Sequence, residues 1–210
     1  ISHMDAEIGR VLDKLQSSGQ WDNTIVLFVS DHGDMMGDHR LFGKAFYTFS
    51  GCIRIPTIVR IPDGVKGQHS EALISQIDLM PSLLDACDVP LPSGAEAAET
   101  PFQRGAVTPL CAYPGHSWKD VVLRGAKGTR DNVVIENDDP STGLRPRTLV
   151  TPRYRLTVYP KHAEGELFDL EKDPDELINL WHTQPDLRKE LQAELLNAYT
   201  RSTPLFPIPP

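Results

Sequence analysis

Long apolar runs and an excess of positive charge are both lacking from this sequence. No stretch of its 210 residues approaches the roughly 20 consecutive apolar residues that a membrane-spanning helix requires. The 21 lysines and arginines are outnumbered by 29 aspartates and glutamates, which gives a formal net charge of -8. Binding to a phosphate backbone calls for clustered lysine and arginine side chains. We therefore expect neither a membrane nor a nucleic acid as a partner.

Cysteine is scarce, and its spacing excludes one class of site. Cys52, Cys87 and Cys111 are widely spaced and form no C-x-x-C pair, which argues against a zinc site built from cysteines. Cys87 stands among leucines in PSLLDACDV, and we expect it to be a small core residue. No cysteine pattern demands an oxidising compartment. The apolar content of 40% is ordinary for a soluble globular protein, and a cytoplasmic and a periplasmic location both stay open.

The first segment, ISHMDAEIGRVLDKLQSSG, has the pattern of an amphipathic helix. Its apolar residues fall on one helical face, and Gly19 is well placed to end the helix. The stripe begins at Ile1 with no capping residue in front of it. We expect a chain that starts inside a helix and therefore belongs to a longer protein.

The next elements indicate an α/β fold. TIVLFV, at residues 24–29, is a continuous run typical of a parallel strand buried on both faces. PTIVRI, at residues 56–61, predicts a second strand, and SQIDLMPSLLDACDV predicts a helix capped near Asp78. This alternation is that of a doubly wound, mostly parallel sheet flanked by helices. We expect residues 1–118 to form part of such a domain, ending in a surface excursion from about residue 90. The residues of the third element expected to face inward are Leu79, Leu83, Leu84 and Cys87.

Residues 119–210 have a different character, that of a small antiparallel sheet packed with a helix. DVVLRG, NVVIEN, RTLVTPRYRLTVY and GELFDL are short alternating segments separated by turn residues. Asp173 and Glu176 have the spacing of a capping box for a short helical turn. PDLRKELQAELLNAYTRS predicts an amphipathic helix, and the tail PLFPIPP is expected to be extended.

A carboxylate and an imidazole stand side by side where the first predicted strand ends, in VLFVSDHGDMMGDH. Ligands of open parallel sheets bind beyond the carboxyl ends of the strands, which is where Asp31 and His32 fall. Gly33 permits the turn that lets both side chains reach one ion. This donor pair suits Mn²⁺ or Zn²⁺ and is tolerable for Ca²⁺ or Mg²⁺. The alternative is a polar loop in which Asp31 accepts hydrogen bonds from backbone N–H groups.

The longer pattern SDHGDMMGDHRLFGK, which ends at Lys44, resembles the metal and anion segment of the type I sulfatases in the alkaline phosphatase superfamily. The likeness is closest to the choline sulfatase and phosphonate monoester hydrolase branch. Other segments fall in the order of that family. They are DAEIGRVLDKL, RIPTIVRIP, ISQIDLMPSLLDACDVPLP and RTLVTPRYRLTVY with GELFDLEKDPDELINL.

The resemblance implies roles for three residues. Asp31 and His32 would be two of the four protein ligands of a catalytic divalent cation, either Ca²⁺ or Mn²⁺, with Mg²⁺ or Zn²⁺ as further possibilities. Lys44 would bind a non-bridging oxygen of the sulfuryl group or steady the leaving oxygen, where negative charge develops in the transition state.

The remaining polar and aromatic candidates carry less weight. Asp34, Asp38 and His39 are expected to support the loop or lie on the surface. We expect four histidines to be exposed and two arginines to lie on the surface, while three aromatic residues after Lys44 fit a substrate pocket or core packing equally. These residues are His69, His116, His162, His182, Arg145, Arg147, Phe46, Tyr47 and Phe49.

A sulfatase needs a formylglycine made from the cysteine or serine of a C/S-x-P-x-R motif, and this sequence contains no such motif. By resemblance, the chain is therefore the C-terminal segment of a metal-dependent hydrolase of sulfate esters, whose formylglycine lies in the N-terminal half. We expect this segment alone to be inactive. Its expected partners are a small sulfate ester and either a second copy or the N-terminal half. The alternatives are a phosphonate or phosphate ester hydrolase of the same superfamily, and a non-catalytic fragment that acts in assembly or binding.

Overall fold

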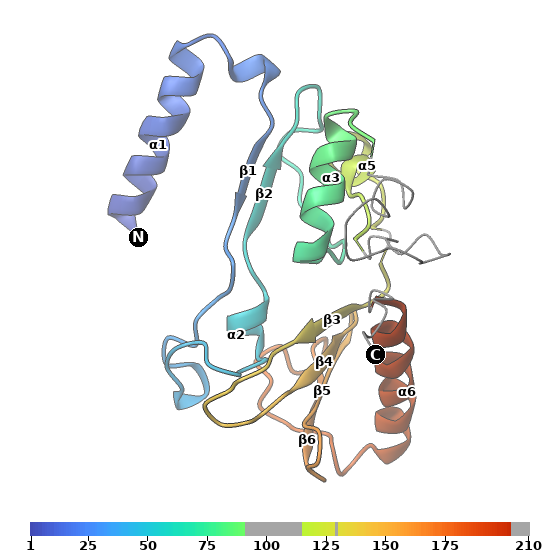
Figure 1. Cartoon of the computed structure of the whole chain (residues 1–210). Helices are drawn as coiled ribbons and strands as arrows, with labels where there is room; N and C mark the ends of the chain where they lie inside the picture. Colours follow the sequence, from blue (N-terminus) through green and yellow to red (C-terminus); the bar gives the residue numbers. More distant parts are fainter. Residues whose placement is uncertain (91–114, 129, 203–210) are drawn as a thin grey trace, which may run out of the picture.

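The computed structural model describes residues 1–90, 115–128 and 130–202, and Figure 1 shows how their elements are arranged. An N-terminal part carries a helix, a two-stranded ribbon and two short helices that pack together. A C-terminal part carries a four-stranded sheet and a long helix. In chain order the elements are α1 (Ser2–Ser17), η1 (Trp21–Asn23), β1 (Val26–Val29), η2 (Asp38–Arg40), α2 (Ser50–Ile53), β2 (Thr57–Arg60), η3 (Gln76–Asp78), α3 (Leu79–Ala86), α5 (Lys119–Arg124), β3 (Val133–Glu136), β4 (Arg147–Val150), β5 (Tyr154–Val158), β6 (Gly165–Asp169) and α6 (Pro185–Ser202).

Helix α1 confirms the amphipathic pattern but buries none of it. Ser2–Ser17 is helical, and Gly19 follows with a left-handed φ of 71°, as expected for a residue that ends a helix. No residue of α1 is buried, and Met4 and Val11 are 67% and 69% exposed. Figure 1 shows α1 standing apart from the β1–β2 ribbon. The apolar stripe of α1 is therefore open to solvent in this chain.

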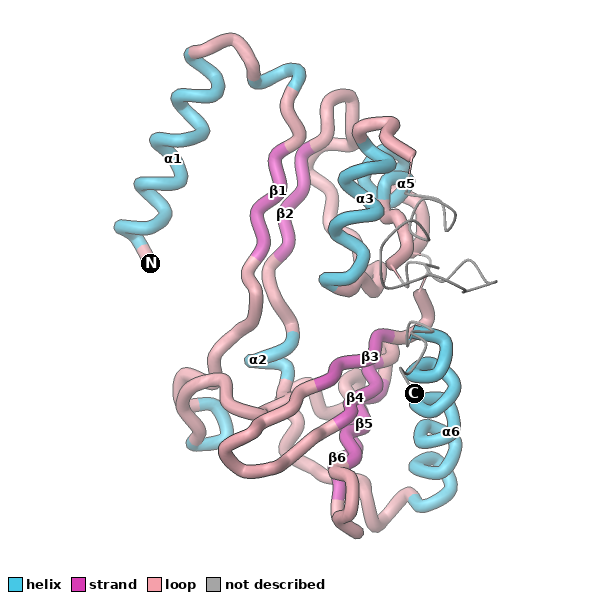
Figure 2. Tube along the Cα trace, in the orientation of Figure 1, coloured by secondary structure: helices cyan, strands magenta, loops and turns pink. Residues whose placement is uncertain are grey.

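Strands β1 and β2 pair antiparallel, which differs from the parallel arrangement expected for them. Val26 lies opposite Arg60 and Val29 opposite Thr57. A parallel pair needs a crossover connection, usually a helix, that returns the chain to the same end of the sheet. The connection between β1 and β2 instead leaves and returns at one end of the ribbon (Figure 2). The ribbon is also not buried on both faces, because Phe28 and Ile58 are 39% and 65% exposed.

The C-terminal part confirms the predicted antiparallel sheet and its helix. The sheet has the order β3-β4-β5-β6, with each strand antiparallel to the next. Alternation along β4, β5 and β6 turns one leucine from each strand toward α6, as the two-residue period of a strand requires. These leucines form the core with residues of α6 and the preceding loop. The core residues are Leu149, Leu156, Leu167, Trp181, Leu191, Leu195 and Ala198.

Three local predictions were wrong. DVVLRG is not a strand: Lys119–Arg124 forms helix α5, which follows the buried Trp118, packs on α3 and ends at Gly125 with φ 65°. These tertiary contacts outweigh the strand preference of its two valines. Cys87 is exposed, because α3 ends one residue before it. Glu176 caps no helix, since its side chain turns inward to Arg155.

The predicted helix begins where expected, since Asp78 is the residue before the first turn of α3, although its side chain makes no capping hydrogen bond to α3. Ser75 caps the short helix η3 in a capping box whose second member is Asp78. The Asp78 carboxylate is buried and pairs with Arg130, whose Nε donates to Oδ2 over 2.8 Å. This pair ties η3 to the segment before β3, while Gln76 of η3 donates to the Asp31 carbonyl beyond the end of β1. The predicted excursion at residues 91–114, Cys111 and the tail at 203–210 lie outside the described residues.

Candidate active site

Asp31 and His32 follow the end of β1 and turn their side chains toward each other. The His32 Nε2 atom lies 3.4 Å from Asp31 Oδ2. Regular strand geometry would point the two side chains to opposite faces, but β1 ends at Val29. Two bonds hold the turn: Ser30 Oγ donates to the His32 carbonyl over 2.7 Å, and Gln76 Nε2 donates to the Asp31 carbonyl over 2.6 Å. The two donors can therefore reach one ion.

The hydrogen bonds of His32 determine which ring nitrogen offers a lone pair. Nδ1 lies 2.7 Å from the Gly33 carbonyl oxygen, which can only accept, so Nδ1 carries the proton. Nε2 is then the acceptor, and Lys44 Nζ donates to it over 2.5 Å. A histidine whose Nδ1–H is bound to a carbonyl is oriented as metal-ligating histidines are. The Nε2 lone pair faces the Asp31 carboxylate and the Lys44 ammonium.

A backbone hydrogen bond favours the charged form of the Asp31 carboxyl. The His32 N–H donates to Asp31 Oδ1 over 3.0 Å, and this bond, together with the nearby charge of Lys44, lowers the pKa of the Asp31 carboxyl below its usual value. The side chain is 83% exposed. Asp31 thus presents an open carboxylate, with Oδ2 free of the backbone bond.

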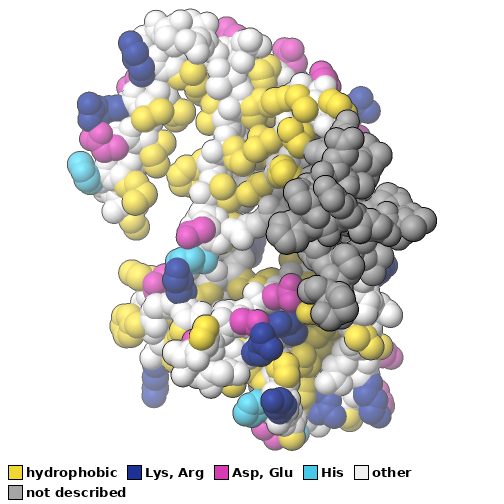
Figure 3. Space-filling model, in the orientation of Figure 1, with side chains coloured by type: hydrophobic (Ala, Val, Ile, Leu, Met, Phe, Trp, Pro, Cys, Tyr) yellow, Lys and Arg dark blue, Asp and Glu magenta, His cyan; other side chains and the backbone are white. Residues whose placement is uncertain are grey.

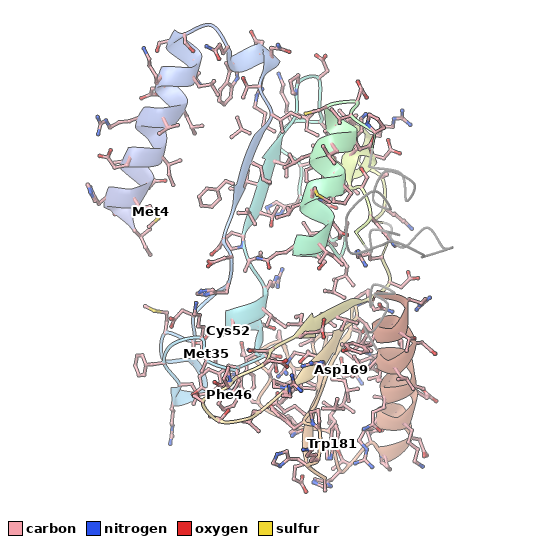
Figure 4. The ribbon with its side chains drawn as sticks, in the orientation of Figure 1. Met4, Met35, Phe46, Cys52, Asp169 and Trp181 are labelled. Carbon is pink, nitrogen blue, oxygen red and sulfur yellow. The ribbon has the colours of Figure 1, made fainter. Side chains whose placement is uncertain are left out.

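Gly33 makes possible the close contact between this turn and α2. Its N–H donates to the Cys52 carbonyl over 2.7 Å. A Cβ atom at position 33 would lie 1.9 Å from the Gly51 carbonyl oxygen, far inside any real contact. Cys52 is buried, and Figure 4 shows it beside Met35 where the loop meets α2. The chain therefore needs glycine immediately after His32.

The loop between His32 and Lys44 closes on Asp34. Asp34 Oδ1 accepts the N–H groups of Met36 over 2.9 Å and of Gly43 over 3.2 Å. These bonds fold the loop back on itself, so that Lys44 returns to His32 although the two residues are twelve positions apart. Asp34 thus supports the loop, as the sequence predicted. His39 also lies in this loop and stacks on Phe49, with ring centroids 4.0 Å apart.

The other candidate side chains lie elsewhere. Arg145 and Arg147 both pair with Asp138, over 2.9 and 2.8 Å, and Arg147 also lies over the ring of Tyr199. Phe46 packs against Tyr47, and Phe49 lies over Arg155. All four histidines expected at the surface are exposed. They are His69, His116, His162 and His182.

The described part of the chain contains no complete metal site. No group of three or more histidine, cysteine, aspartate or glutamate side chains in residues 1–90, 115–128 and 130–202 is placed to hold a metal ion. Asp31 and His32 supply two donors of the types that divalent cations accept. Gln76, whose side chain holds the Asp31 backbone, was not identified from the sequence.

Comparison with known proteins points to one family. Residues 1–89 match the sulfatase family. The chain is 34% identical over 188 residues to an arylsulfatase of Clostridium perfringens, an alignment that covers 88% of this chain and 35% of the relative. Residues 1–89 of this chain thus belong to the sulfatase family. The chain spans about a third of the length of such curated sulfatases.

Solved structures extend the likeness to the fold. The chain matches the structure of BT4656 in complex with its substrate D-glucosamine-2-N,6-O-disulfate, with a TM-score of 0.79, 25% identity and coverage of 94% of this chain and 38% of that one. A phosphonate monoester hydrolase of Silicibacter pomeroyi shares the fold, with a TM-score of 0.77 at 24% identity over 96% of this chain and 39% of that one. The chain therefore has part of the alkaline-phosphatase-like fold.

The family also bears on cofactors and on the membrane. Sulfatases generally use a divalent metal and a formylglycine, and the donor pair of Asp31 and His32 is chemically suited to the first. No helix in the described ranges is long and apolar enough to cross a membrane.

Proposed function

We propose that this chain supplies the metal- and anion-binding edge of a sulfatase active site, which hydrolyses small sulfate esters. The observation that carries the proposal is one cluster at the end of β1. It joins Asp31 Oδ2 to His32 Nε2 over 3.4 Å and His32 Nε2 to Lys44 Nζ over 2.5 Å. A carboxylate, an oriented imidazole and an ammonium group in this order suit a cation and a tetrahedral anion bound side by side.

Each side chain has one role in this proposal. Asp31 Oδ2 and His32 Nε2 would hold a divalent cation, Ca²⁺ or Mn²⁺ in the first instance, with Mg²⁺ and Zn²⁺ as further candidates. When bound, that cation stabilises negative charge on the ester oxygens. Lys44 donates to His32 Nε2, the atom that the cation would require. Once Nε2 ligates the cation, the Lys44 ammonium would turn to a sulfuryl oxygen, where it stabilises the charge of the transition state.

The chain by itself is proposed to be inactive toward sulfate esters. Sulfatases generally use formylglycine, and no C/S-x-P-x-R motif occurs in these 210 residues. Positioning and electrostatic stabilisation by Lys44 do not replace a covalent nucleophile. Two donors alone also leave the geometry of a cation poorly determined. The formylglycine and the remaining ligands would come from an N-terminal half.

Metal content and turnover of the full-length sulfatase test the proposal. Asp31→Ala is expected to abolish turnover of an aryl sulfate and to lower bound metal on elemental analysis, because it removes one ligand. Glu164→Gln is the matched control, since Glu164 is an exposed carboxylate 2.7 Å from the imidazole of His182 and lies on another part of the chain. An Asp31→Ala protein with normal metal and turnover would contradict the assignment.

Substrate class is tested with the same protein. A sulfate ester is the proposed substrate, and hydrolysis of an aryl sulfate is expected to exceed that of the matching phosphonate monoester in kcat/KM. A higher kcat/KM for the phosphonate monoester would favour the alternative hypothesis of a phosphonate hydrolase, in which the same metal site and Lys44 bind a phosphorus centre.

We also propose that the part of this chain that carries α1 and the β1–β2 ribbon is an association surface. Its partner would be a second copy of this chain or the N-terminal half of the full-length protein. Exposed apolar side chains occur on α1 and on both strands of the ribbon, including Met4, Val11, Phe28 and Ile58. Figure 3 shows hydrophobic side chains along α1 and along the elements facing it. Apolar faces of this kind mark protein interaction sites, and a two-stranded ribbon also leaves unpaired edges.

A further inference from the structure

The most deeply buried charge in the described residues belongs to Arg155 on β5. Its side chain is fully buried, and its guanidinium pairs with two carboxylates, Glu176 and Glu166, the latter over 2.7 Å. Replacing a buried ion pair by apolar residues is often neutral or stabilising, so stability alone is a weak reason for such a pair. Its contacts point to a positional role.

The pair holds three consecutive residues that follow Lys44, Thr48 to Ser50. Arg155 Nη1 donates to Thr48 Oγ1 over 3.0 Å. The guanidinium lies over the rings of both Phe49 and Phe168, 4.8 and 4.7 Å from their centroids. The Ser50 N–H donates to Glu176 Oε2 over 2.7 Å. The C-terminal part thus holds segment 48–50 through three contacts, which are made to the Thr48 side chain, the Phe49 ring and the Ser50 backbone N–H.

Segment 48–50 leads directly to the candidate site. Gly51 and Cys52 follow it, and their carbonyl oxygens lie against Gly33, the residue after His32. Cys52 Sγ also lies 3.8 Å from the Lys44 carbonyl oxygen. The positions of Lys44 and His32 therefore depend on the same short piece of backbone. Figure 2 shows the loop and α2 lying beside the C-terminal sheet.

A second contact from the C-terminal sheet reaches the residue after Lys44. Asn137, which follows β3, donates from Nδ2 to the Ala45 carbonyl over 3.1 Å. The backbone on the C-terminal side of Lys44 is thus tied to the sheet at residue 45 and again at segment 48–50.

We propose that the Arg155–Glu176 pair is a positioning device that sets Lys44 against His32 through segment 48–50. This inference rests on the role of Lys44 proposed above. The pair touches no substrate; it holds the backbone from which Lys44 reaches the transition state. A small displacement of a charge-stabilising group lowers the rate much more than it lowers the stability of the fold.

A substitution at Ser50 can remove the contact between segment 48–50 and Glu176 selectively. It is the first residue of α2, a position where proline is tolerated because the N–H has no partner inside the helix. Phe49 has φ -65° and ψ 154°, which is compatible with a residue before proline. Ser50→Pro therefore removes the N–H that Glu176 accepts and leaves the Arg155–Glu176 pair in place. Ser50→Ala keeps that N–H and is the matched control.

Turnover in the full-length sulfatase is the first readout. Ser50→Pro is expected to lower kcat and kcat/KM together by about tenfold, as expected when an interaction made in the transition state is weakened. Ser50→Ala is expected to stay within about twofold of the parent. In a Lys44→Ala background, Ser50→Pro is expected to cause no further loss, because coupled residues are not additive. A purely structural role would lower both backgrounds alike.

Hydrogen exchange of the 210-residue chain is the second readout and does not depend on activity. Ser50→Pro is expected to speed exchange of the Gly33 amide and of residues 44–52, and Ser50→Ala to leave both unchanged. If Ser50→Pro does not fold, Glu176→Gln replaces it, with Asp169→Asn as its control. Asp169 is a buried carboxylate on the neighbouring strand β6, and its ion pair is with Arg153 and not with segment 48–50.

The outcomes separate this inference from the proposed function. An active parent whose Ser50→Pro and Glu176→Gln variants keep full kcat overturns the positioning role. A parent with no metal-dependent ester hydrolysis overturns the proposed function and with it the catalytic part of the inference. In that case, unchanged hydrogen exchange of the Gly33 amide in Ser50→Pro would also overturn the structural link from Glu176 through segment 48–50 to Gly33. Faster exchange of that amide would uphold the link.

Discussion

At the scale of single residues, the candidate site depends on how close backbone atoms come to one another. Gly33 lies so near Gly51 that no side chain fits between them, and this contact sets His32 on its carbonyl partner. The chemistry of the imidazole thus follows from a packing constraint on its neighbour. Two predictions belong to this scale.

Gly33→Ala is expected to destabilise the chain by about 3 kcal/mol, because its Cβ would overlap the Gly51 carbonyl and force the backbone apart. Gly9→Ala is the matched control. Gly9 lies inside α1 with no atom within 4 Å of an added Cβ, so this change is expected to stabilise the helix by about 1 kcal/mol. Urea unfolding of the two variants measures both values, and equal stabilities would contradict the packing argument.

Asp169→Asn is expected to make the free energy of unfolding depend less on pH in the acid range. Hydrogen bonds from Arg153, the largest cause, hold the pKa of the Asp169 carboxyl below its ordinary value of 3.8. A carboxyl with a lowered pKa in the folded state stabilises above its unfolded pKa, and this contribution is lost as the pH falls through and below 3.8. Urea unfolding of parent and variant, repeated about every half pH unit from pH 6 downward, measures the difference. Identical slopes would contradict the prediction.

At the scale of elements, helix α6 shows how an amphipathic pattern becomes a core. Its apolar positions recur on one face, and that face packs on the leucines of β4, β5 and β6. Neighbouring leucines on α6 have opposite surroundings, since Leu195 is 6% exposed and Leu196 is 63% exposed. The pair allows a matched test of which face is buried.

Leu195→Ala is expected to cost about 2 to 5 kcal/mol of unfolding free energy, because it removes buried methyl groups and leaves a cavity. Leu196→Ala is expected to change that free energy by less than about 0.5 kcal/mol. Fluorescence of Trp181, which lies in the same core, follows the unfolding of this part of the chain (Figure 4). Similar losses in the two variants would show that the packed face is wrongly assigned.

At the scale of the whole molecule, the two parts differ in how far they bury their apolar surface. The C-terminal sheet and α6 enclose a core, while α1 buries nothing and the ribbon exposes apolar residues on its strands. The exposed residues belong to the part that matches the sulfatase family over residues 1–89. This asymmetry leads to a prediction about assembly.

The purified chain is expected to associate at micromolar concentration, with a light-scattering mass above the 23.4 kDa of one copy. Ile58→Lys is expected to reduce that association, because Ile58 is an exposed residue of the ribbon. Leu177→Lys alters an equally exposed residue of the C-terminal part and is expected to have no effect. A monomer mass for the parent at every concentration would contradict the prediction.

The sequence by itself determined the elements with strong local signals. The period of the apolar residues was enough for α1 and α6, and alternation was enough for β3 to β6, because these patterns depend on nearest neighbours along the chain. Asp31 and His32 were likewise predicted as ligands from their place after a strand, and Lys44 was predicted as an anion-binding residue from the family resemblance. Only the tertiary structure decided the antiparallel pairing of β1 with β2, the helical state of α5 and the exposure of Cys87. It alone showed that Arg155 and Glu176 meet segment 48–50, since that contact joins residues more than a hundred positions apart and no local pattern records it.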